Sequence, residues 1–318
     1  MNTPRHQRLQ RALFRGDALT FENPEYRHAA NHLMEALLEA DGASDDLTSE
    51  ALGFEGRAGR AEILAREPGI VAGLQEVGAL LQGSGLNVSV CRRDGDSIQP
   101  GDVLLHTEGD DSRLLSFERL GLNLLQRMSG VATASNSLQA RARQHGSAYV
   151  VGTRKTPWGL LDKRALHVGG CGTHRLGLSD AILIKNNHLA LIAATEQEAA
   201  PIAIERVWES RAQSAFIEVE VRSEDAARSA AHAFRKLRVA SSDDYPCLLM
   251  LDNVPPQAVA GIVKMLQRES LWDDTLIEAS GGVSEASVGV YASTGVDAVS
   301  MGALTHSVRA LDISQRLS

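Results

Sequence analysis

The amino-acid sequence predicts an α/β protein, with a parallel β/α barrel as its larger part and a compact α+β domain before it. The chain has 318 residues and is 43% hydrophobic, which is enough for a full core and roughly two domains. After Gly130, short apolar strands alternate with helical segments, as in a parallel sheet. Charged residues and glycines follow several of these strands, at the end where β/α barrels carry their active sites.

The region before Gly130 combines helices with short strands. Apolar residues recur at helical spacing from Tyr26 to Ala40, and Asp41-Gly42 ends that pattern. A second helix is expected at residues 71–81, and strands are expected at residues 59–66, 88–91 and 103–107. This order indicates a compact domain that mixes both kinds of element.

A helix beginning at Asp111 carries so many leucines up to Met128 that it has no polar face. Such a helix is expected to be buried between domains or subunits. Arg119 on it would then need an anionic partner, because a buried unpaired charge is costly. Pairing with neighbouring Glu118 is the structural alternative to ligand binding.

The region after Gly130 reads as a regular alternation of strands and helices. We expect strands at residues 148–152, 181–185, 216–221, 247–251, 275–279 and 298–301. Helices are expected at about 132–144, 201–213, 226–237 and 256–268, and Pro201 would occupy the first turn of the second one. A β/α barrel is the most economical architecture for this pattern.

Composition excludes several classes of function. A net charge of −8 and a pI near 5.7 argue against general binding to nucleic acid or to an anionic membrane. The three cysteines lack metal-site or disulfide spacing and fit a reducing cytoplasm. No apolar run reaches the roughly 20 residues needed to cross a bilayer. Four arginines before Asp17 resemble a transit peptide, although a leading helix or a tail gives the same pattern.

Basic residues gather at two expected strand ends and in one glycine-rich loop. Arg154 and Lys155 follow the first strand, His174 and Arg175 follow the glycines, and Lys185 ends the next strand. Brought together, such cations repel one another unless a polyanion lies between them, and arginine binds carboxylate or phosphate through paired N–H donors. The pattern therefore predicts a strongly acidic small ligand. For each residue singly, a solvated loop is the plain alternative.

Carboxylates and glycines end the later strands. Glu220 and Asp252 are expected to face the same opening as the cations, where they could hold Mg²⁺ beside a substrate phosphate or only balance charge. Ser280-Gly281-Gly282 and Gly302 follow the last two strands, where barrels often bind phosphate through backbone N–H groups. A single Gly-Gly pair is usually only a turn, so the prediction depends on there being two such loops.

These motifs, read together, resemble the quinolinate phosphoribosyltransferase family. The segments that carry the resemblance are TRKT, HRLGLSDAILIK, IEVEV, LLMLDN, EASGG and GVDAVSMGALTHSVRALDIS, with earlier matches from about Tyr26. The resemblance implies an N-terminal α/β sandwich domain over residues 1–130 and an open or incomplete, TIM-like β/α barrel over residues 131–306. It also implies that a C-terminal helix, residues 307–318, returns to the sandwich. The protein would be a homodimer in which each sandwich covers the barrel of its partner.

The resemblance also implies a reaction and a set of roles. The chain would transfer phosphoribosyl from phosphoribosyl pyrophosphate (PRPP) to quinolinate with loss of CO₂, giving nicotinate mononucleotide for NAD biosynthesis. Lys155, Lys185, Glu220 and Asp252 would be the catalytic residues, and the last two would also bind Mg²⁺. The quinolinate and PRPP contacts would come from Arg119 of the partner subunit and from Arg154, His174, Arg175, Ser280, Gly281, Gly282, Gly302 and His306.

Four departures from the family pattern leave the acceptor and the metal affinity open. Residues 157–161 are shorter than the usual loop by about two residues and lack its arginine, and Asn186 follows Lys185 in place of aspartate. Gly152 and Cys171 also differ from the common residues. The alternatives are a phosphoribosyltransferase for another pyridine or heteroaromatic acid, a Schiff-base aldolase with Lys185 as nucleophile, and a ligand-binding homologue impaired in catalysis.

Overall fold

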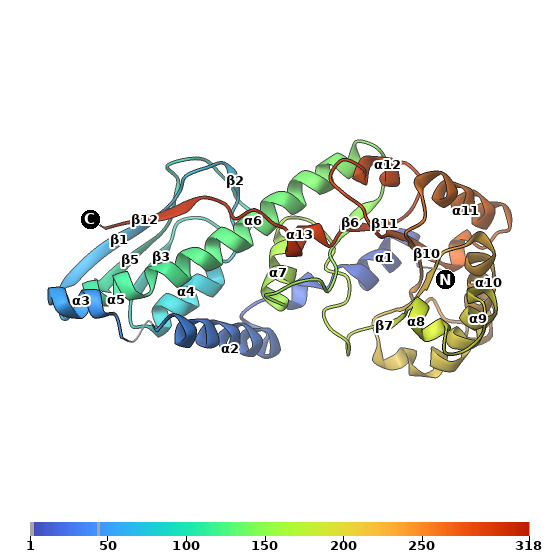
Figure 1. Cartoon of the computed structure of the whole chain (residues 1–318), viewed down its shortest axis with the longest axis horizontal. Coiled ribbons are helices and arrows are strands. Elements are labelled where there is room, and N and C mark those ends of the chain that lie inside the picture. The colour runs from blue at the N-terminus through green and yellow to red at the C-terminus, as the bar shows by residue number, and fades with distance from the viewer. Residues whose placement is uncertain (1–2, 43–44, 318) are drawn as a thin grey trace. The chain divides into compact units, whose positions relative to one another are not determined.

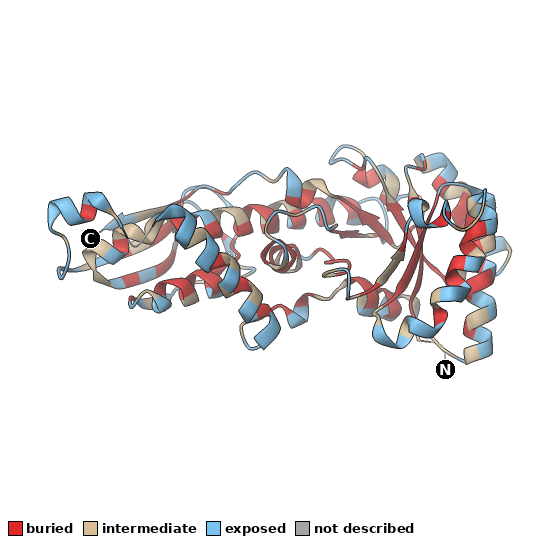
Figure 2. Cartoon of the chain, turned by 60° about the horizontal axis from the view of Figure 1, so that its bottom comes forward, coloured by how far each residue is buried: buried red, intermediate tan, exposed pale blue. Residues whose placement is uncertain are grey.

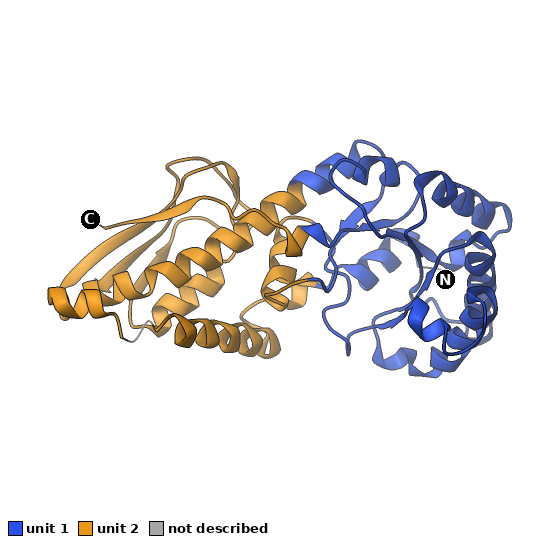
Figure 3. Cartoon of the chain, viewed as in Figure 1, with its two compact units in different colours: residues 1–15, 137–155, 171–303 blue, residues 16–136, 156–170, 304–318 orange. Residues whose placement is uncertain are grey.

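The computed structural model of the chain describes residues 3–42 and 45–317. Contacts divide the chain into two compact units that interleave in sequence (Figure 3). Unit 1 contains residues 1–15, 137–155 and 171–303, and unit 2 contains residues 16–136, 156–170 and 304–318. Within the described ranges, no helix is both long and apolar enough to cross a membrane.

Unit 1 is built on a six-stranded sheet in which every pair of neighbours is parallel (Figure 1). The strand order is β6-β11-β10-β9-β8-β7, so β6 and β7 are the two edges and the barrel is open. The strands are β6 (Tyr149–Val151), β7 (Ile182–Ile184), β8 (Ile217–Val221), β9 (Cys247–Asp252), β10 (Leu276–Ser280) and β11 (Ala298–Ser300). All six expected strands are confirmed.

Helices cover the outer face of this sheet, and Figure 2 shows its strands as mostly buried. Helices α9 and α10 contact β8, and α10 also contacts β9. The helical elements of unit 1 are α1 (Arg5–Leu13), α8 (Asn186–Leu189), α9 (Glu196–Val207), η2 (Trp208–Gln213), α10 (Glu224–Ser241), α11 (Pro256–Arg268), η3 (Trp272–Asp274) and α12 (Val288–Ala292). The short helix α13 (Ala303–His306) begins at the last residue of this unit.

Helix α1 is part of the barrel core. Its Leu9 and Leu13 are almost fully buried, and they share one apolar cluster with the residues that begin or precede the sheet strands, among them Ala181, Phe216, Leu248, Leu276 and Ala298. The arginines of this segment pair with the same unit, as Arg15 does with Asp180 at 3.0 Å. The basic N-terminal stretch is therefore an ordered helix that covers the N-terminal ends of the strands.

Unit 2 contains an antiparallel sheet with helices. The sheet order is β12-β1-β5-β3, with β12 (Ile313–Leu317), β1 (Ala58–Ala65), β5 (Val103–Asp110) and β3 (Asn87–Val90), and β2 (Gly69–Ile70) pairs with β4 (Ser97–Ile98). Its helical elements are η1 (Gly16–Ala18), α2 (Pro24–Asp41), α3 (Leu47–Leu52), α4 (Leu74–Gly83), α5 (Asp111–Ser116), most of α6 (Glu118–Arg143) and α7 (Leu160–Val168).

Two secondary-structure predictions were wrong, and a third was confirmed only as part of a longer helix. The C-terminal segment is not a helix: β12 pairs with β1, which offers it an open edge of backbone donors and acceptors. Helix α9 begins at Glu196, because Thr195 caps it by accepting the Glu198 N–H at 3.3 Å, so Pro201 lies inside the helix. The helix expected at 132–144 is the second half of the long α6, which runs through the expected domain boundary at residue 130.

Arg119 is not buried within a single chain. The leucines of α6 are buried, but Arg119 is exposed, and the Glu118 carboxylate accepts a hydrogen bond from Gln315 Nε2 at 3.1 Å. The expected burial of Arg119 between subunits stays a prediction.

Candidate active site

A cavity of about 330 Å³ opens at the C-terminal ends of the unit 1 strands. All of its lining residues belong to that unit: Thr153, Arg154, Lys155, His174, Arg175, Leu183, Lys185, Glu220, Met250, Asp252, Glu278, Ser280 and Ser300. The strand ends thus bring together side chains that are far apart in the sequence. This is the position at which parallel β/α folds bind their ligands.

Strand register explains why these side chains meet. Glu220 lies beside Met250, and Met250 lies beside Glu278 on the next strand. One layer nearer the strand ends, Asp252 lies beside Ser280. Because alternate residues of a strand share a face, these side chains all line the cavity.

The cations of the cavity differ in burial. Arg175 is only 6% exposed, and its Nη1 donates to the Ala181 carbonyl at 3.2 Å. Arg154, Lys155 and Lys185 are exposed at the cavity wall. Burial, and then the positive charge of Arg154, lower the pKa of Arg175, and an anion between the two would relieve that repulsion. The geometry therefore supports an acidic ligand.

Glu220 and Asp252 form an acidic pair on the neighbouring strands β8 and β9. Burial raises the pKa of Glu220, and the negative charge of Asp252 raises it further, while Lys185 lowers it. Two carboxylates that repel each other in a partly buried site offer the oxygen ligands that Mg²⁺ takes. The residues present therefore fit the expected magnesium ion.

The turn after β10 requires glycine. Gly281 has a φ of +92°, and a Cβ placed there would lie 2.5 Å from Asn253 Oδ1. Gly282 follows with a φ of +62° and open space around its Cα. The turn is closed by the Asn253 N–H, which donates to the Ser280 carbonyl at 2.8 Å. Beyond Ser280 the chain therefore presents bare backbone at the strand end, as a phosphate site requires.

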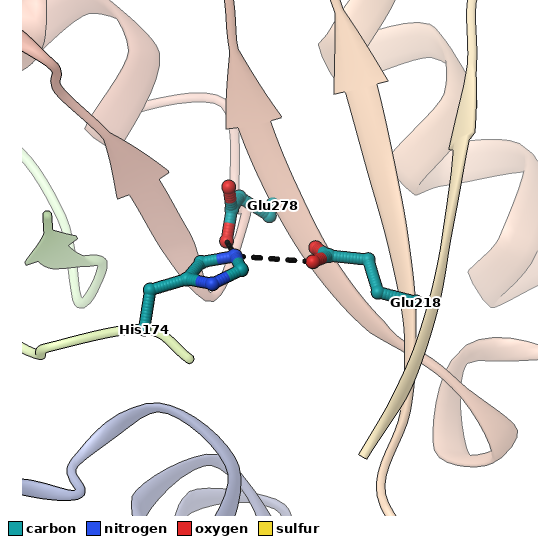
Figure 4. Close-up of side chains that lie close together, drawn as sticks. All are labelled: His174, Glu218 and Glu278. Carbon is teal, nitrogen blue, oxygen red and sulfur yellow. Dashed lines mark ion pairs between the residues drawn. The ribbon is translucent and has the colours of Figure 1, made fainter. Parts of the chain in front are cut away.

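His174 and Glu278, which line the cavity, form a buried cluster with Glu218 (Figure 4). His174 Nε2 lies 3.0 Å from Glu218 Oε2 and 3.4 Å from Glu278 Oε2, and both glutamates are fully buried. Burial alone would lower the pKa of His174, but the charges of Glu278 and Glu218 outweigh it and raise that pKa. Burial and the charge of Glu278 raise the pKa of Glu218 to about 7. The two carboxylates therefore favour a proton on the ring nitrogen that faces them.

Most of the residues predicted as site residues meet in this cavity: Arg154, Lys155, His174, Arg175, Lys185, Glu220, Asp252 and Ser280. Gly281 and Gly282 continue the chain directly from Ser280, and Gly302 follows the lining residue Ser300 by two positions. Arg119 and the exposed His306 belong to unit 2, so their roles stay predictions.

Glu218, Glu278 and Ser300 were not among the predicted site residues. The signal for Glu218 was present, because it stands two residues before Glu220 on one strand and so must share its face. Ser300 is a common residue type at a strand end and carries no comparable signal.

An open parallel β/α barrel whose strand ends collect cations, a carboxylate pair and a glycine turn defines an enzyme for a small polyanionic substrate. Two family models narrow that class. Residues 46–129 match the quinolinate phosphoribosyl transferase N-terminal domain, and residues 131–316 match the C-terminal domain of the same name. The chain belongs to the quinolinate phosphoribosyltransferase family.

Individual relatives agree with that assignment. A probable nicotinate-nucleotide pyrophosphorylase [carboxylating] of Methanothermobacter thermautotrophicus is 35% identical, covering 89% of this chain and 96% of the relative. One from Archaeoglobus fulgidus is 36% identical over 81% and 93% of the two chains. The solved nicotinate-nucleotide pyrophosphorylase from Francisella tularensis superposes with a TM-score of 0.75 at 27% identity, covering 92% of this chain and 96% of that one.

Proposed function

We propose that this protein transfers the phosphoribosyl group of PRPP to quinolinate with decarboxylation, and so acts as a nicotinate-nucleotide diphosphorylase (carboxylating) in NAD biosynthesis. The observation that carries the proposal is the joint placement of cations, a carboxylate pair and a glycine turn around one cavity in a chain of this family. Quinolinate supplies two carboxylates, and PRPP supplies three phosphates, which together match that distribution of charge.

The cations of the cavity would bind the aromatic acid. Arg175 and Arg154 would bind the quinolinate carboxylates, and Arg175 is suited to a paired contact because burial removes competing water. In the family pattern, Arg119 would reach this site from the partner subunit of a homodimer. Lys155 and Lys185 would contact both PRPP and the acid, and so neutralise charge where the two substrates meet.

The carboxylate pair and the residues after the last two strands would bind PRPP. Glu220 and Asp252 would bind the ribose hydroxyls and hold Mg²⁺, and the metal when bound neutralises charge on the leaving pyrophosphate. Ser280, Gly281, Gly282, Gly302 and His306 would bind the 5-phosphate. These residues fix the anomeric carbon opposite the pyridine nitrogen.

Bond changes follow from that arrangement. The pyridine nitrogen forms a bond to the anomeric carbon while the bond from that carbon to the pyrophosphate oxygen breaks, through an oxocarbenium-like state. The bond from ring carbon 2 to its carboxylate then breaks, CO₂ leaves, and the electron pair on the ring takes up a proton. Positioning of the two substrates contributes about 7–11 kcal/mol to such a reaction, and fixed charges contribute several more.

A direct assay separates this reaction from the remaining alternatives. The protein is incubated with PRPP, Mg²⁺ and either quinolinate or nicotinate, and pyrophosphate and CO₂ are measured. We expect both products with quinolinate and neither with nicotinate. Turnover of a different acid would favour the alternative acceptor raised by the short 157–161 loop, and binding without pyrophosphate release would indicate an impaired homologue. With the family established, the Schiff-base aldolase is no longer an alternative.

Assembly and location are further parts of the proposal. We infer a homodimer from the family pattern, in which Arg119 of one subunit reaches the acid bound by its partner. The exposure of Arg119 in the single chain is compatible with that role. We also infer a cytoplasmic enzyme, which fits a sequence whose three cysteines show no disulfide spacing. Sedimentation equilibrium tests the first inference, and cell fractionation tests the second.

A further inference from the structure

His174 is held by its surroundings from several sides. Its φ of 55° places a non-glycine residue in the left-handed region, which persists only where neighbouring contacts enforce it. The His174 N–H donates to the Leu13 carbonyl at 3.0 Å, and Thr173 Oγ1 donates to the His174 carbonyl at 2.9 Å. The ring packs edge-on against Phe216 with 5.4 Å between centroids. His174 therefore has one fixed orientation.

Both ring nitrogens of His174 already face partners inside the protein (Figure 4). Nδ1 accepts the backbone N–H of Arg175 at 2.8 Å. Nε2 points at Glu218 and Glu278, at 3.0 and 3.4 Å. A substrate carboxylate could contact a ring nitrogen only by displacing one of these groups. The geometry is that of a support, unlike the ligand contact expected from the family pattern.

The Arg175 contact also decides which nitrogen carries the proton. Because Nδ1 accepts an N–H, its lone pair is occupied and the ring proton resides on Nε2, between the two carboxylates. The distances from Nε2 to the two carboxylates would suit neighbouring ligands of a divalent metal. A metal on Nε2, however, needs Nδ1 to be a donor, and the Arg175 N–H prevents that. A shared proton, and no metal, fits this cluster.

We propose that Glu218, His174 and Glu278 form a buried support that positions Arg175, and that His174 is a positioning residue and not a substrate ligand. The chain of contacts runs from the two carboxylates through the ring to the Arg175 backbone, while the Arg175 side chain is held by the Ala181 carbonyl. This inference rests on the proposed function, because it defines how the acid-binding arginine is kept in place.

A positioning role for the two glutamates and a purely electrostatic role predict opposite changes in the binding of quinolinate when one carboxylate is removed. Glu218 and Glu278 place negative charge near the cations of the cavity, and among the described residues the His174 ring is the ion-pair partner of both carboxylates. Removing one charge makes the cavity more positive, so electrostatics alone predicts tighter binding of quinolinate. If the carboxylates hold His174 and Arg175 in place, the same change weakens binding. The direction of the change therefore decides between the two.

The first test replaces each carboxylate by its amide. We expect Glu218→Gln and Glu278→Gln to raise the KM for quinolinate roughly tenfold or more, the loss of about one hydrogen bond to a charged group, while the KM for PRPP changes less than about twofold. Glu76→Gln is the matched control, because Glu76 is a fully buried carboxylate of unit 2 that has no assigned role in the site. It should leave both KM values unchanged.

A spectroscopic test needs no active variant. The ¹⁵N spectrum of the imidazole rings in the full-length protein should show His174 protonated on Nε2 and unprotonated on Nδ1, and the signal is assigned by its absence in His174→Gln. Saturating quinolinate and added Zn²⁺ should each leave those two nitrogen shifts in place. A shift on adding quinolinate would make His174 a substrate ligand, and a shift with Zn²⁺ would make the cluster a metal site.

Different results would contradict the proposed function and the positioning role of the buried cluster. A wild-type protein that does not turn over quinolinate contradicts the function. A wild-type protein that does, while both glutamine variants keep or lower their KM for quinolinate, overturns the support. If the variants do not fold, the nitrogen spectrum of the wild-type protein still decides the question.

Discussion

Arg175 is the cation that burial commits most strongly to an anionic ligand. The Arg175 side chain is 6% exposed. Burial lowers the pKa of Arg175, and the positive charge of Arg154 lowers it further. A guanidinium in that environment is stabilised by a carboxylate that binds through two parallel hydrogen bonds. The affinity for the acid should therefore depend on this one side chain more than on the exposed Lys155 and Lys185.

Replacing Arg175 by alanine should abolish measurable turnover without unfolding the protein. Two charge-assisted hydrogen bonds contribute about 1.5–3 kcal/mol each, which corresponds to a loss of roughly 10²- to 10⁴-fold in kcat/KM. Arg268→Ala, at an exposed arginine of α11, is the control for loss of one positive charge. Near-normal kinetics in Arg175→Ala, with circular dichroism unchanged, would remove the acid-binding assignment.

The buried cluster makes a prediction about stability and pH. Burial and the charge of Glu278 raise the pKa of Glu218 from its ordinary value of 4.5 to about 7, so the folded state favours the protonated form of this carboxyl group. The stability that it contributes is fully present below pH 4.5 and is lost as the pH rises through about 7. In EDTA, the melting temperature of the wild type should fall more between pH 5 and pH 8 than that of Glu218→Gln. Parallel decreases in the two proteins would contradict this.

Single residues also show the limit of sequence reading. Arg154, Lys185, Glu220 and Asp252 could be predicted because each follows or ends an apolar strand, and parallel strands end at one edge. The role of His174 could not, because its left-handed backbone and its paired ring nitrogens depend on contacts with residues far away in sequence.

The strand-to-helix turns connect the fold to the proposed phosphate site. In the turn after β10, Asn253 and Gly281 pack so closely that a methyl group at position 281 would displace the amide of Asn253. The backbone of this turn is therefore fixed by its neighbours, and its N–H groups are held in place before a phosphate arrives. Such preorganisation favours binding because little conformational freedom is lost.

Gly281→Ala should raise the KM for PRPP by tenfold or more, because both the positive φ and the contact with Asn253 oppose a Cβ. Gly282→Ala should have a smaller effect, since its surroundings are open and only backbone strain of about 1–2 kcal/mol arises. Gly53→Ala, at a left-handed and open position of unit 2, measures that strain in an element with no assigned role in the site. Equal KM values in all three variants would rule out a PRPP contact at this turn.

Elements with a clear apolar pattern were predictable, and elements that depend on distant parts of the chain were not. The helix over Pro256–Arg268 and the strand over Ile217–Val221 have clear apolar patterns and appear close to their expected bounds. The strand over Ile313–Leu317 exists because β1 offers an open edge, and the helix over Leu160–Val168, which was not predicted, follows the shortened loop. Neighbours elsewhere in the chain determine such segments, and local sequence does not reveal them.

The whole molecule concentrates positive charge in one cavity while its net charge is −8. Such a distribution favours a small polyanion over nucleic acid, because a duplex needs an extended basic surface. The family assignment covers both units through two separate models, so the reaction belongs to the chain as a whole. Arg119 in unit 2 would take its proposed role in a homodimer.

The proposed homodimer can be tested by complementation. Arg119→Ala and Arg175→Ala should each be inactive alone, because each removes a contact to the acid. After the two are mixed, unfolded and refolded together, about half of the dimers are hybrids, and one of the two sites in each hybrid is intact. Activity should recover to about a quarter of the wild-type value. No recovery, with hybrids shown by native mass spectrometry, would place both arginines in the same subunit's site.

The central claim is that one cavity joins quinolinate to PRPP and then releases CO₂. The most direct measurement follows quinolinate labelled with ¹³C in its 2-carboxylate by mass spectrometry, in the presence of PRPP and Mg²⁺. We expect nicotinate mononucleotide without the label, with one labelled CO₂ and one pyrophosphate for each nucleotide formed. A nucleotide that keeps the label, or pyrophosphate release without CO₂, would contradict the account.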